Sequence, residues 1–365
     1  MKISEITTHL ETIAPRAFQE SYDNSGLQLG NEEAEISSAL LALDVNEAVV
    51  DEAIAQGCNL IIAHHPLIFG GLKKLTSGNA TERTVLKAIK NDVAVYAIHT
   101  NLDNVLSGVN AKIAERIGLI YLRILQPREG WLFKLAVFVP NSFAETLREA
   151  LFTAGAGQIG NYDQCSFNTQ GKGTFRAGEG ANPFIGKHGV TQIEPETKVE
   201  CVVAKHLMSN VLAAMKAAHP YEEVAYNTSP MLNTHPEAGS GLIGNLETPL
   251  NQEEWLAHLK KTMNPSCIKF TKTHKAKIQK IAVCGGAGSF LLTDAISQDA
   301  DAFVTSDFKY HEFFGAEERL MICDIGHWES EIWTTELLRD NLLKRFPTFA
   351  ARISDTNTNP VNYYY

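Results

Sequence analysis

The stretch Ile61-Ile62-Ala63-His64-His65-Pro66 places two adjacent histidines directly after an apolar run at residues 59–63. A short uninterrupted apolar run of this kind is typical of a strand that is buried on both faces of a sheet. Pro66 lacks a ladder donor and restricts the residue before it, so we expect the strand to end before the histidines. Once outside the alternation of the strand, His64 and His65 can turn toward one common site. The alternative is a pair of partly exposed loop histidines with capping roles.

Apolar runs alternate with helical patterns on both sides of this strand. The N-terminal part predicts strands at residues 38–43, 59–63 and 93–98, and helices at residues 3–13, 47–55, 84–90 and 109–116. The same rhythm returns late in the chain, with strands at residues 280–283, 302–304 and 321–323, and helices at residues 290–297, 311–319 and 329–346. Buried strands separated by helices predict an α/β fold with mostly parallel, mixed sheets and flanking helices.

The middle of the chain has a different pattern. It reads as a strand at 133–139, a helix at 144–154, a glycine-studded pair of strands with a long loop at 165–189, a strand at 199–204, a helix at 207–219 and a strand at 223–228. This order predicts an inserted ferredoxin-like α+β domain. Polar, Pro- and Gly-rich stretches flank it, as expected for an insertion. We therefore expect a discontinuous domain of residues 1–128 and 233–365, with an insert at 129–232.

Asp103 and His99 come shortly after the predicted strand at residues 93–98. A carboxylate at such a strand end can bridge two cations, and the alternative for Asp103 is a cap of a turn or of the helix at 109–116. His99 can form a hydrogen bond that orients one of the metal ligands without binding the metal itself. The alternative is a structural histidine whose hydrogen bonds are satisfied within the fold.

His327 and Glu331 follow the predicted strand at residues 321–323, where a helix begins. Residues four apart on a helix share one face, so these two side chains can converge on one ion. Glu329 points elsewhere in this pattern and is expected to face solvent or the helix dipole. The alternative for the whole segment is an ordinary acidic first turn.

All three groups follow predicted strands at the edge of the sheet where ligands bind in α/β folds. We therefore predict a metal site built from His64, His65, Asp103, His327 and Glu331. Three imidazoles and two carboxylates, without a thiolate, suit zinc, iron or manganese. Five side chains suffice for two divalent ions if the carboxylates bridge, as in hydrolytic sites whose ions lie about 3.5 to 4 Å apart.

Composition narrows the classes of function. The chain has 32 Lys and Arg against 42 Asp and Glu, and a net charge of −10 disfavours a nucleic-acid partner. The first 25 residues show no leader, and no apolar run approaches the roughly 18 residues of a membrane span, so we expect a cytoplasmic protein. The six scattered cysteines form no CxxC pair, which indicates buried thiols in a reducing compartment.

Two weaker features follow other strands. Asp307, Lys309 and His311 come after residues 302–304 and could contact a substrate or supply a proton, with surface and capping roles as the alternative. The glycine-rich run at 285–289 could direct backbone amides at an anion, with a tight turn as the alternative.

Taken together, the motifs resemble the NGG-one-interacting-factor-three family, whose bacterial members are often labelled GTP cyclohydrolase type 2 homologues. The resemblance rests on Tyr22-Asp23-Asn24-Ser25-Gly26-Leu27, His64-His65-Pro66, His99-Thr100-Asn101-Leu102-Asp103, Ser306-Asp307 with Tyr310-His311, and Gly326-His327 with Glu331. Carried over by position, it implies dinuclear ligands at the same five residues and a toroidal homohexamer. The insert resembles that of the longer bacterial members, which is similar to PII and CutA folds.

The resulting functional hypothesis is a metal-dependent hydrolase acting on a nucleotide-like or other small substrate, with ring opening of GTP as the named candidate. His311 or His99 would move protons in such a reaction. The alternative is a non-catalytic metal-binding ring with a regulatory, metal-storage or scaffold role. A metal ion with a coordination position open to an exchangeable water would favour the hydrolase hypothesis over this alternative.

Overall fold

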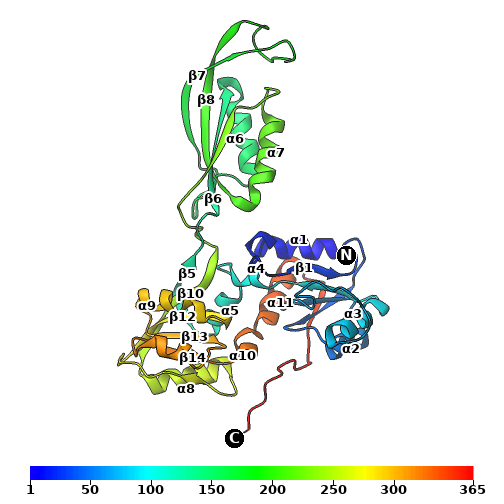
Figure 1. Cartoon of the computed structure of the whole chain (residues 1–365), viewed down its shortest axis with the longest axis vertical. Helices are drawn as coiled ribbons and strands as arrows, with labels where there is room; N and C mark the ends of the chain where they lie inside the picture. Colours follow the sequence, from blue (N-terminus) through cyan, green and yellow to red (C-terminus); the bar gives the residue numbers. More distant parts are fainter. Residues whose placement is uncertain (365) are drawn as a thin grey trace. The chain divides into compact units, whose positions relative to one another are not determined.

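The protein is described by a computed structural model that covers residues 1–364, and it divides into two compact units (Figure 1). One unit combines Met1–Gln126 with Glu237–Tyr365, and the other is Pro127–Pro236. The second unit encloses the insert expected at residues 129–232. None of the helices formed by residues 1–364 has the length and apolar character to cross a membrane.

The first unit contains a five-stranded sheet with the strand order β1-β4-β3-β2-β15. Its strands are β1 Gly26–Leu29, β2 Ser38–Ala42, β3 Leu60–Ala63, β4 Ala94–Ala97 and β15 Ala350–Ile353. All pairs are parallel except β1 with β4. Every residue of β2, β3 and β4 is buried, which confirms that their apolar runs form the covered centre of a sheet.

The helices of this region include Thr100–Asp103, which was not predicted, and Ala80–Lys90, which begins four residues before its predicted start. They are α1 Ile3–Ile13, α2 Glu47–Ala55, α3 Ala80–Lys90, the short α4 Thr100–Asp103, and α5 Val109–Ile117. The side chains of Asn46 and Asn79 accept hydrogen bonds from the first turns of α2 and α3, and Gly118 ends α5 in a left-handed conformation with φ 82°. The boundaries of α2 and α5 agree with the predicted ranges to within one residue.

A second, six-stranded sheet in the same unit has the strand order β11-β14-β13-β12-β10-β5. Its strands are β5 Leu119–Pro127, β10 Gly239–Leu250, β11 Lys269–Phe270, β12 Ile278–Ala287, β13 Ala302–Ser306 and β14 Met321–Asp324. The helices of this region are α8 Gln252–Met263, α9 Leu292–Ser297, α10 His327–Glu331 and α11 Thr334–Arg345. β12, β13 and β14 are parallel, whereas β10 and β11 pair antiparallel to their neighbours. The expected mixed α/β fold is therefore confirmed.

Two predicted helices of this region differ in the structure. The helix expected at 329–346 begins at His327 and is interrupted at Ile332 and Trp333, a β-branched and an aromatic residue of lower helix propensity, before α11 begins at Thr334. The helix expected at 311–319 is reduced to the 3₁₀ turn Glu312–Ala316, because Glu317 and Glu318 adopt positive φ angles of 47° and 55°.

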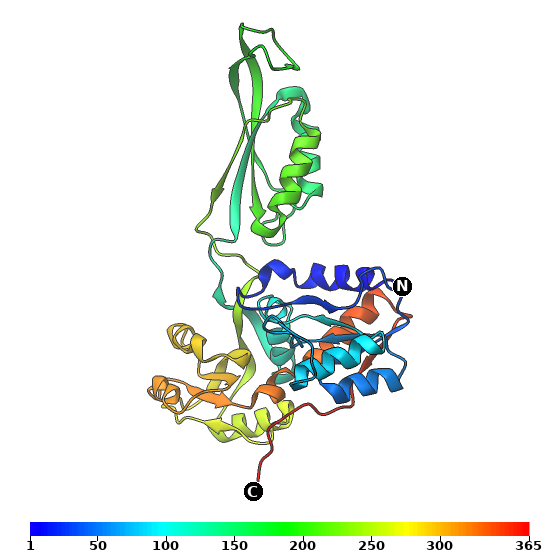
Figure 2. The same ribbon diagram turned by 45° about the vertical axis from the view of Figure 1, so that its right-hand side comes forward.

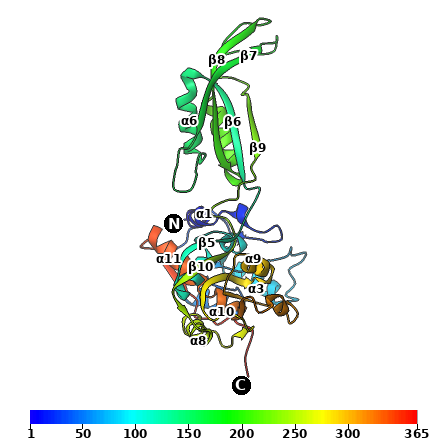
Figure 3. The same ribbon diagram turned by 90° about the vertical axis from the view of Figure 1, so that its left-hand side faces the viewer.

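The second unit forms a four-stranded antiparallel sheet with the order β7-β8-β6-β9. Its elements are β6 Leu132–Pro140, α6 Ala144–Thr153, β7 Phe167–Arg176, β8 Thr191–Ala204, α7 Met208–Ala218 and β9 Tyr226–Pro230, with the β-α-β-β-α-β order of ferredoxin-like units. Both helices lie on one face of the sheet, and β9 lies beside β6 at one edge (Figures 2 and 3).

One strand assignment in this unit is wrong. Of the two strands and the long loop expected at 165–189, the structure contains one strand, β7, and the loop, and β8 begins at Thr191 instead of 199. Pro195 and alternating charged residues conceal the first half of β8 from a prediction that searches for apolar runs.

Candidate metal centre

The histidine pair is positioned by the end of β3. The strand stops at Ala63, as expected, and the backbone N–H groups of His64 and His65 donate to the carbonyls of Ala42 and Leu43 at 3.2 and 2.9 Å. Both residues therefore stay anchored to the sheet while their side chains leave the pleat. The His64 side chain is fully buried, and that of His65 is 22% exposed.

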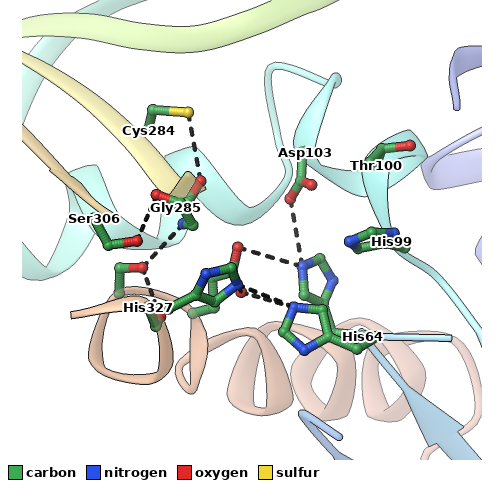
Figure 4. Close-up of polar contacts among 12 residues, drawn as sticks. His64, His99, Thr100, Asp103, Cys284, Gly285, Ser306 and His327 are labelled. Carbon is green, nitrogen blue, oxygen red and sulfur yellow. Dashed lines mark hydrogen bonds and ion pairs between the residues drawn. The ribbon is translucent and has the colours of Figure 1, made fainter. Parts of the chain in front are cut away.

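The second half of the site comes from α10, which begins at His327 and ends at Glu331. His327 Nε2 lies 2.9 Å from Glu331 Oε2, as predicted for residues four apart on one helix face. Asp103 approaches as the last residue of α4 (Figure 4). Glu329 does not face solvent as expected, because it is buried and its carboxylate lies 3.4 Å from the Asn359 amide nitrogen.

These side chains form three overlapping sets whose ligand atoms lie within 4.8 Å of one another. The sets are His64 with His65 and His99, His65 with His327 and Glu331, and His64 with Asp103 and Glu331. All five predicted residues are thus brought together. His99 joins them directly, whereas the sequence suggested it as a partner of a ligand or a proton carrier.

Every imidazole of the site is held by its Nδ1 atom. The acceptors are Ile98 O for His64 at 2.8 Å, Asp44 Oδ1 for His65 at 2.7 Å, Asp23 Oδ1 for His99 at 2.7 Å, and Asp307 Oδ2 for His327 at 2.6 Å. An Nδ1–H that donates to oxygen leaves Nε2 as the atom that can bind a cation. An oxygen acceptor thus holds one nitrogen of each imidazole and leaves the other nitrogen available, as is usual for histidines that bind a metal ion.

Two buried acceptor atoms indicate that a cation fits between them. His64 Nε2 and Asp103 Oδ1 are both buried without a hydrogen-bond partner among residues 1–364, and they lie 3.5 Å apart. Glu331 Oε1 is 3.8 Å from the same nitrogen. Because the proton of His64 is on Nδ1, its Nε2 lone pair faces carboxylate oxygens, an arrangement that is unfavourable unless a cation lies between them. The residues present therefore fit a divalent ion bound by nitrogen and oxygen.

The charges of the site are strongly coupled. Burial lowers the pKa of His65, but hydrogen bonds to Asp44 and Glu331 outweigh it and raise that pKa to about 9. For His327 burial is likewise outweighed by Asp307 and Glu331, so its pKa rises to about 11. Burial and the charge of Glu331 raise the pKa of Asp103, while burial lowers that of His64. In the metal-free protein, protons thus supply the positive charge that a cation would supply.

The glycine run at 285–289 has a steric role at this site. Gly286 adopts a φ of 61°, and a Cβ atom there would lie 2.4 Å from Glu331 Oε1. Its backbone N–H donates to Ser330 Oγ at 3.0 Å. The run therefore lets the backbone approach the Glu331 carboxylate closely, and only glycine satisfies both the space and the dihedral angle.

A cavity of about 160 Å³ opens directly onto these donor atoms. Its lining includes Tyr22, His99, Asp103, Phe290, His327 and Glu331. The His327 side chain is 39% exposed, whereas that of Glu331 is only 4% exposed. The cluster is therefore closed on the protein side and accessible from the cavity.

Other predicted residues have different positions. His311 is absent from the donor sets and from the lining of this cavity, and its ring packs against Tyr310 and Phe314. Asp307, expected to contact a substrate or supply a proton, instead holds His327. The orienting role of Asp44 was missed, although this residue follows β2 at the same sheet edge as the histidines. That position was the signal that could have identified it.

The fold and the site define an α/β protein with a candidate metal centre between the edges of two sheets. The chain belongs to the Duf34/NIF3 (NGG1p interacting factor 3) family, which it matches over residues 1–360. It is 40% identical over 332 residues to the GTP cyclohydrolase 1 type 2 homolog of Halalkalibacterium halodurans, covering 90% of this chain and 89% of that protein. The GTP cyclohydrolase 1 type 2 homolog of Bacillus subtilis is 36% identical, covering 98% of both chains.

Solved structures agree with this assignment. The crystal structure of a Bacillus cereus protein related to NIF3 matches with a TM-score of 0.85 and 36% identity, covering 100% of this chain and 99% of that one. The family resemblance inferred from the five motifs is therefore confirmed.

Proposed function

We propose that this protein is a metal-dependent hydrolase that acts on a nucleotide-like small substrate, with ring opening of GTP as the first candidate reaction. The observation that carries the proposal is the cavity that opens onto the donor atoms, because a catalytic metal site needs room for a substrate beside the ion. The names of the relatives from Halalkalibacterium halodurans and Bacillus subtilis agree with this choice of substrate.

The residues divide into those that bind cations and those that serve a substrate. We propose two divalent ions, zinc, iron or manganese, held by His64, His65, Asp103, His327 and Glu331. Such ions lower the pKa of a water molecule and stabilise negative charge that develops on a substrate.

His99 is the stronger candidate for moving a proton. It lines the cavity, and because Asp23 holds its Nδ1 atom, Nε2 can accept a proton and return it. His311 has no comparable position. Tyr22 and Phe69 are exposed at 64% and 52% with ring centroids 6.3 Å apart, and they could stack on a planar base beside the site.

The test is a screen of metal-reconstituted protein against GTP, other nucleotides and phosphoesters, with product formation followed by chromatography. We expect turnover that is removed by a chelator, restored by metal and lost in Glu331→Gln. Glu253→Gln, at an exposed position on α8 outside the cluster, is the matched control and should keep full activity. Metal binding without turnover of any substrate in the panel would favour the alternative, a non-catalytic metal-binding protein.

A further inference from the structure

The insert contains a cavity of its own, with a volume of about 640 Å³. All the residues that line it belong to the unit Pro127–Pro236. It is bounded by the hairpin of β7 and β8, by the loop that follows β7, and by residues 221–225 after α7. Asn182 N donates to Glu222 Oε1 at 2.7 Å, which ties that loop to the segment after α7. A cavity of this size is in the range of small-molecule sites.

Aromatic rings form part of its wall. The Phe175 and Tyr221 ring centroids lie 5.7 Å apart at an interplanar angle of 59°, and Phe184 lies 6.4 Å from Tyr221 at 50°. Phe184 remains 54% exposed. Rings inclined to one another in this way present their faces and edges to a shared space rather than packing flat together.

A buried carboxylate is the main charged group within this wall. Glu196 is only 8% exposed, and no lysine, arginine or histidine of residues 1–364 forms an ion pair with it. The basic residues Lys172 and Arg176 are exposed on β7, and Lys198 pairs with Glu200 at 3.1 Å. The buried charge of the cavity is therefore negative, and burial of an ionised carboxylate is unfavourable unless a positive group compensates it.

Tyr221 supplies a second polar group. Its hydroxyl oxygen is buried and faces the side chain of Glu196. Burial, followed by the charge of Glu196, raises the pKa of this phenol, so the hydroxyl stays protonated and can donate or accept. Glu196 and Tyr221 thus form one polar pair in the wall of the cavity, and the charge of this pair is negative.

Two glycines of β7 keep this arrangement open. A Cβ atom at Gly173 would lie 2.1 Å from Glu196 Oε2, so a side chain there would displace the carboxylate. A Cβ atom at Gly171 would meet no atom within 4 Å. Gly171 lines the cavity in an ordinary strand conformation, so a larger residue at this position would fill the space without backbone strain.

From these observations we propose that the insert binds a small organic cation, namely a protonated amine or guanidinium carried on an apolar or planar body. The cationic group pairs with Glu196 and contacts the ring faces, while the Tyr221 hydroxyl contributes a hydrogen bond and the body fills the space above Gly171. This site is independent of the metal centre and of the reaction proposed for it.

The test is calorimetric titration of the full chain with three probes of similar size, namely 2-phenylethylammonium, the neutral 2-phenylethanol and the anionic phenylacetate. We expect saturable binding of the ammonium at one site per chain, with affinity at least about tenfold above that of the alcohol. Glu196→Gln should remove this preference, and Gly171→Phe should abolish binding. Glu149→Gln, an exposed carboxylate on α6, should change nothing.

Circular dichroism checks that each variant is folded, and the isosteric Glu196→Gln keeps the test informative if Gly171→Phe is unstable. The proposal is overturned if the alcohol or the carboxylate binds as well as the ammonium. It is equally overturned if Glu196→Gln binds like the unaltered chain, or if no probe binds saturably.

Discussion

The Thr358 hydroxyl donates to Asp44 Oδ2 at 2.6 Å, while Oδ1 of the same carboxylate accepts from His65 Nδ1 at 2.7 Å. The C-terminal segment that follows β15 therefore helps to orient an imidazole that lies almost 300 residues earlier in the chain. Burial opposes ionisation of Asp44, but the two hydrogen bonds outweigh it and lower its pKa. The carboxylate thus stays charged and holds the His65 proton on Nδ1.

Thr358→Val should weaken metal binding, though by less than the roughly tenfold or more that direct partners of a ligand contribute, because Thr358 acts on His65 only through Asp44. The measurement is competition with a chromophoric chelator. Thr356→Val is the matched control, since its hydroxyl makes an equally short bond of 2.6 Å to Glu52, which belongs to none of the donor sets. Equal losses in both variants would mean that the tail acts only through general stability.

Glu331→Gln should reduce metal content more than Asp103→Asn. Glu331 belongs to two of the three donor sets and Asp103 to one, so loss of Asp103 leaves the set of His65, His327 and Glu331 intact. Elemental analysis after dialysis against a mild chelator measures the content, and circular dichroism checks the fold. Two tightly bound ions retained in both variants would show that these carboxylates are not ligands.

Metal affinity should rise by about two decades per pH unit between pH 6 and pH 8. His65 and His327, with pKa values raised to about 9 and about 11, both carry an extra proton in the metal-free protein throughout this range. Each must lose that proton to bind an ion, so lower pH weakens binding. With ordinary histidines the slope would flatten above about pH 7. Affinities of the unaltered protein are measured by competition with a chelator, and a slope that flattens above about pH 7 would contradict the prediction. Asp44→Asn and Asp307→Asn remove the acceptors that raise these pKa values, so the slope should flatten in both variants.

Removal of the insert should leave the metal site intact. Arg128 O accepts from His235 N at 3.0 Å, so a short glycine linker can join these two residues without disturbing β5 or β10. Every residue of the donor sets lies in the other unit. The shortened chain should bind as much metal as the full one. An unfolded or metal-free product would show that the insert supports the site.

We also predict a homo-oligomer, with the hexamer implied by the family resemblance as the specific expectation. Apolar surface for association is available in the C-terminal half of the chain, where exposed aromatic residues include Phe270, Tyr310 and Phe314. Light scattering at micromolar concentration should report a mass well above the 40.1 kDa of one chain. A monomer that persists across a wide concentration range would argue against this.

The amino-acid sequence by itself determined the buried strands and the residues at their ends. The apolar runs of β2, β3 and β4 are buried throughout, Pro66 marks the end of β3, and the four-residue spacing of His327 and Glu331 predicts their shared helix face. These features depend on local periodicity and stereochemistry, which a single segment expresses without its neighbours. Strands such as β5 and β10 were missed because their burial is decided by contacts with other parts of the chain.

Only the tertiary structure decided which donor atoms meet. His65 Nε2 lies 2.9 Å from Glu331 Oε2 across a separation of 266 residues, and Asp44 orients that same imidazole. It also showed that His99 joins the cluster while His311 does not. The physical reason is that coordination depends on distances of a few ångströms between side chains of two different sheets. Those distances are set by how the sheets pack, and no local pattern in either segment encodes them.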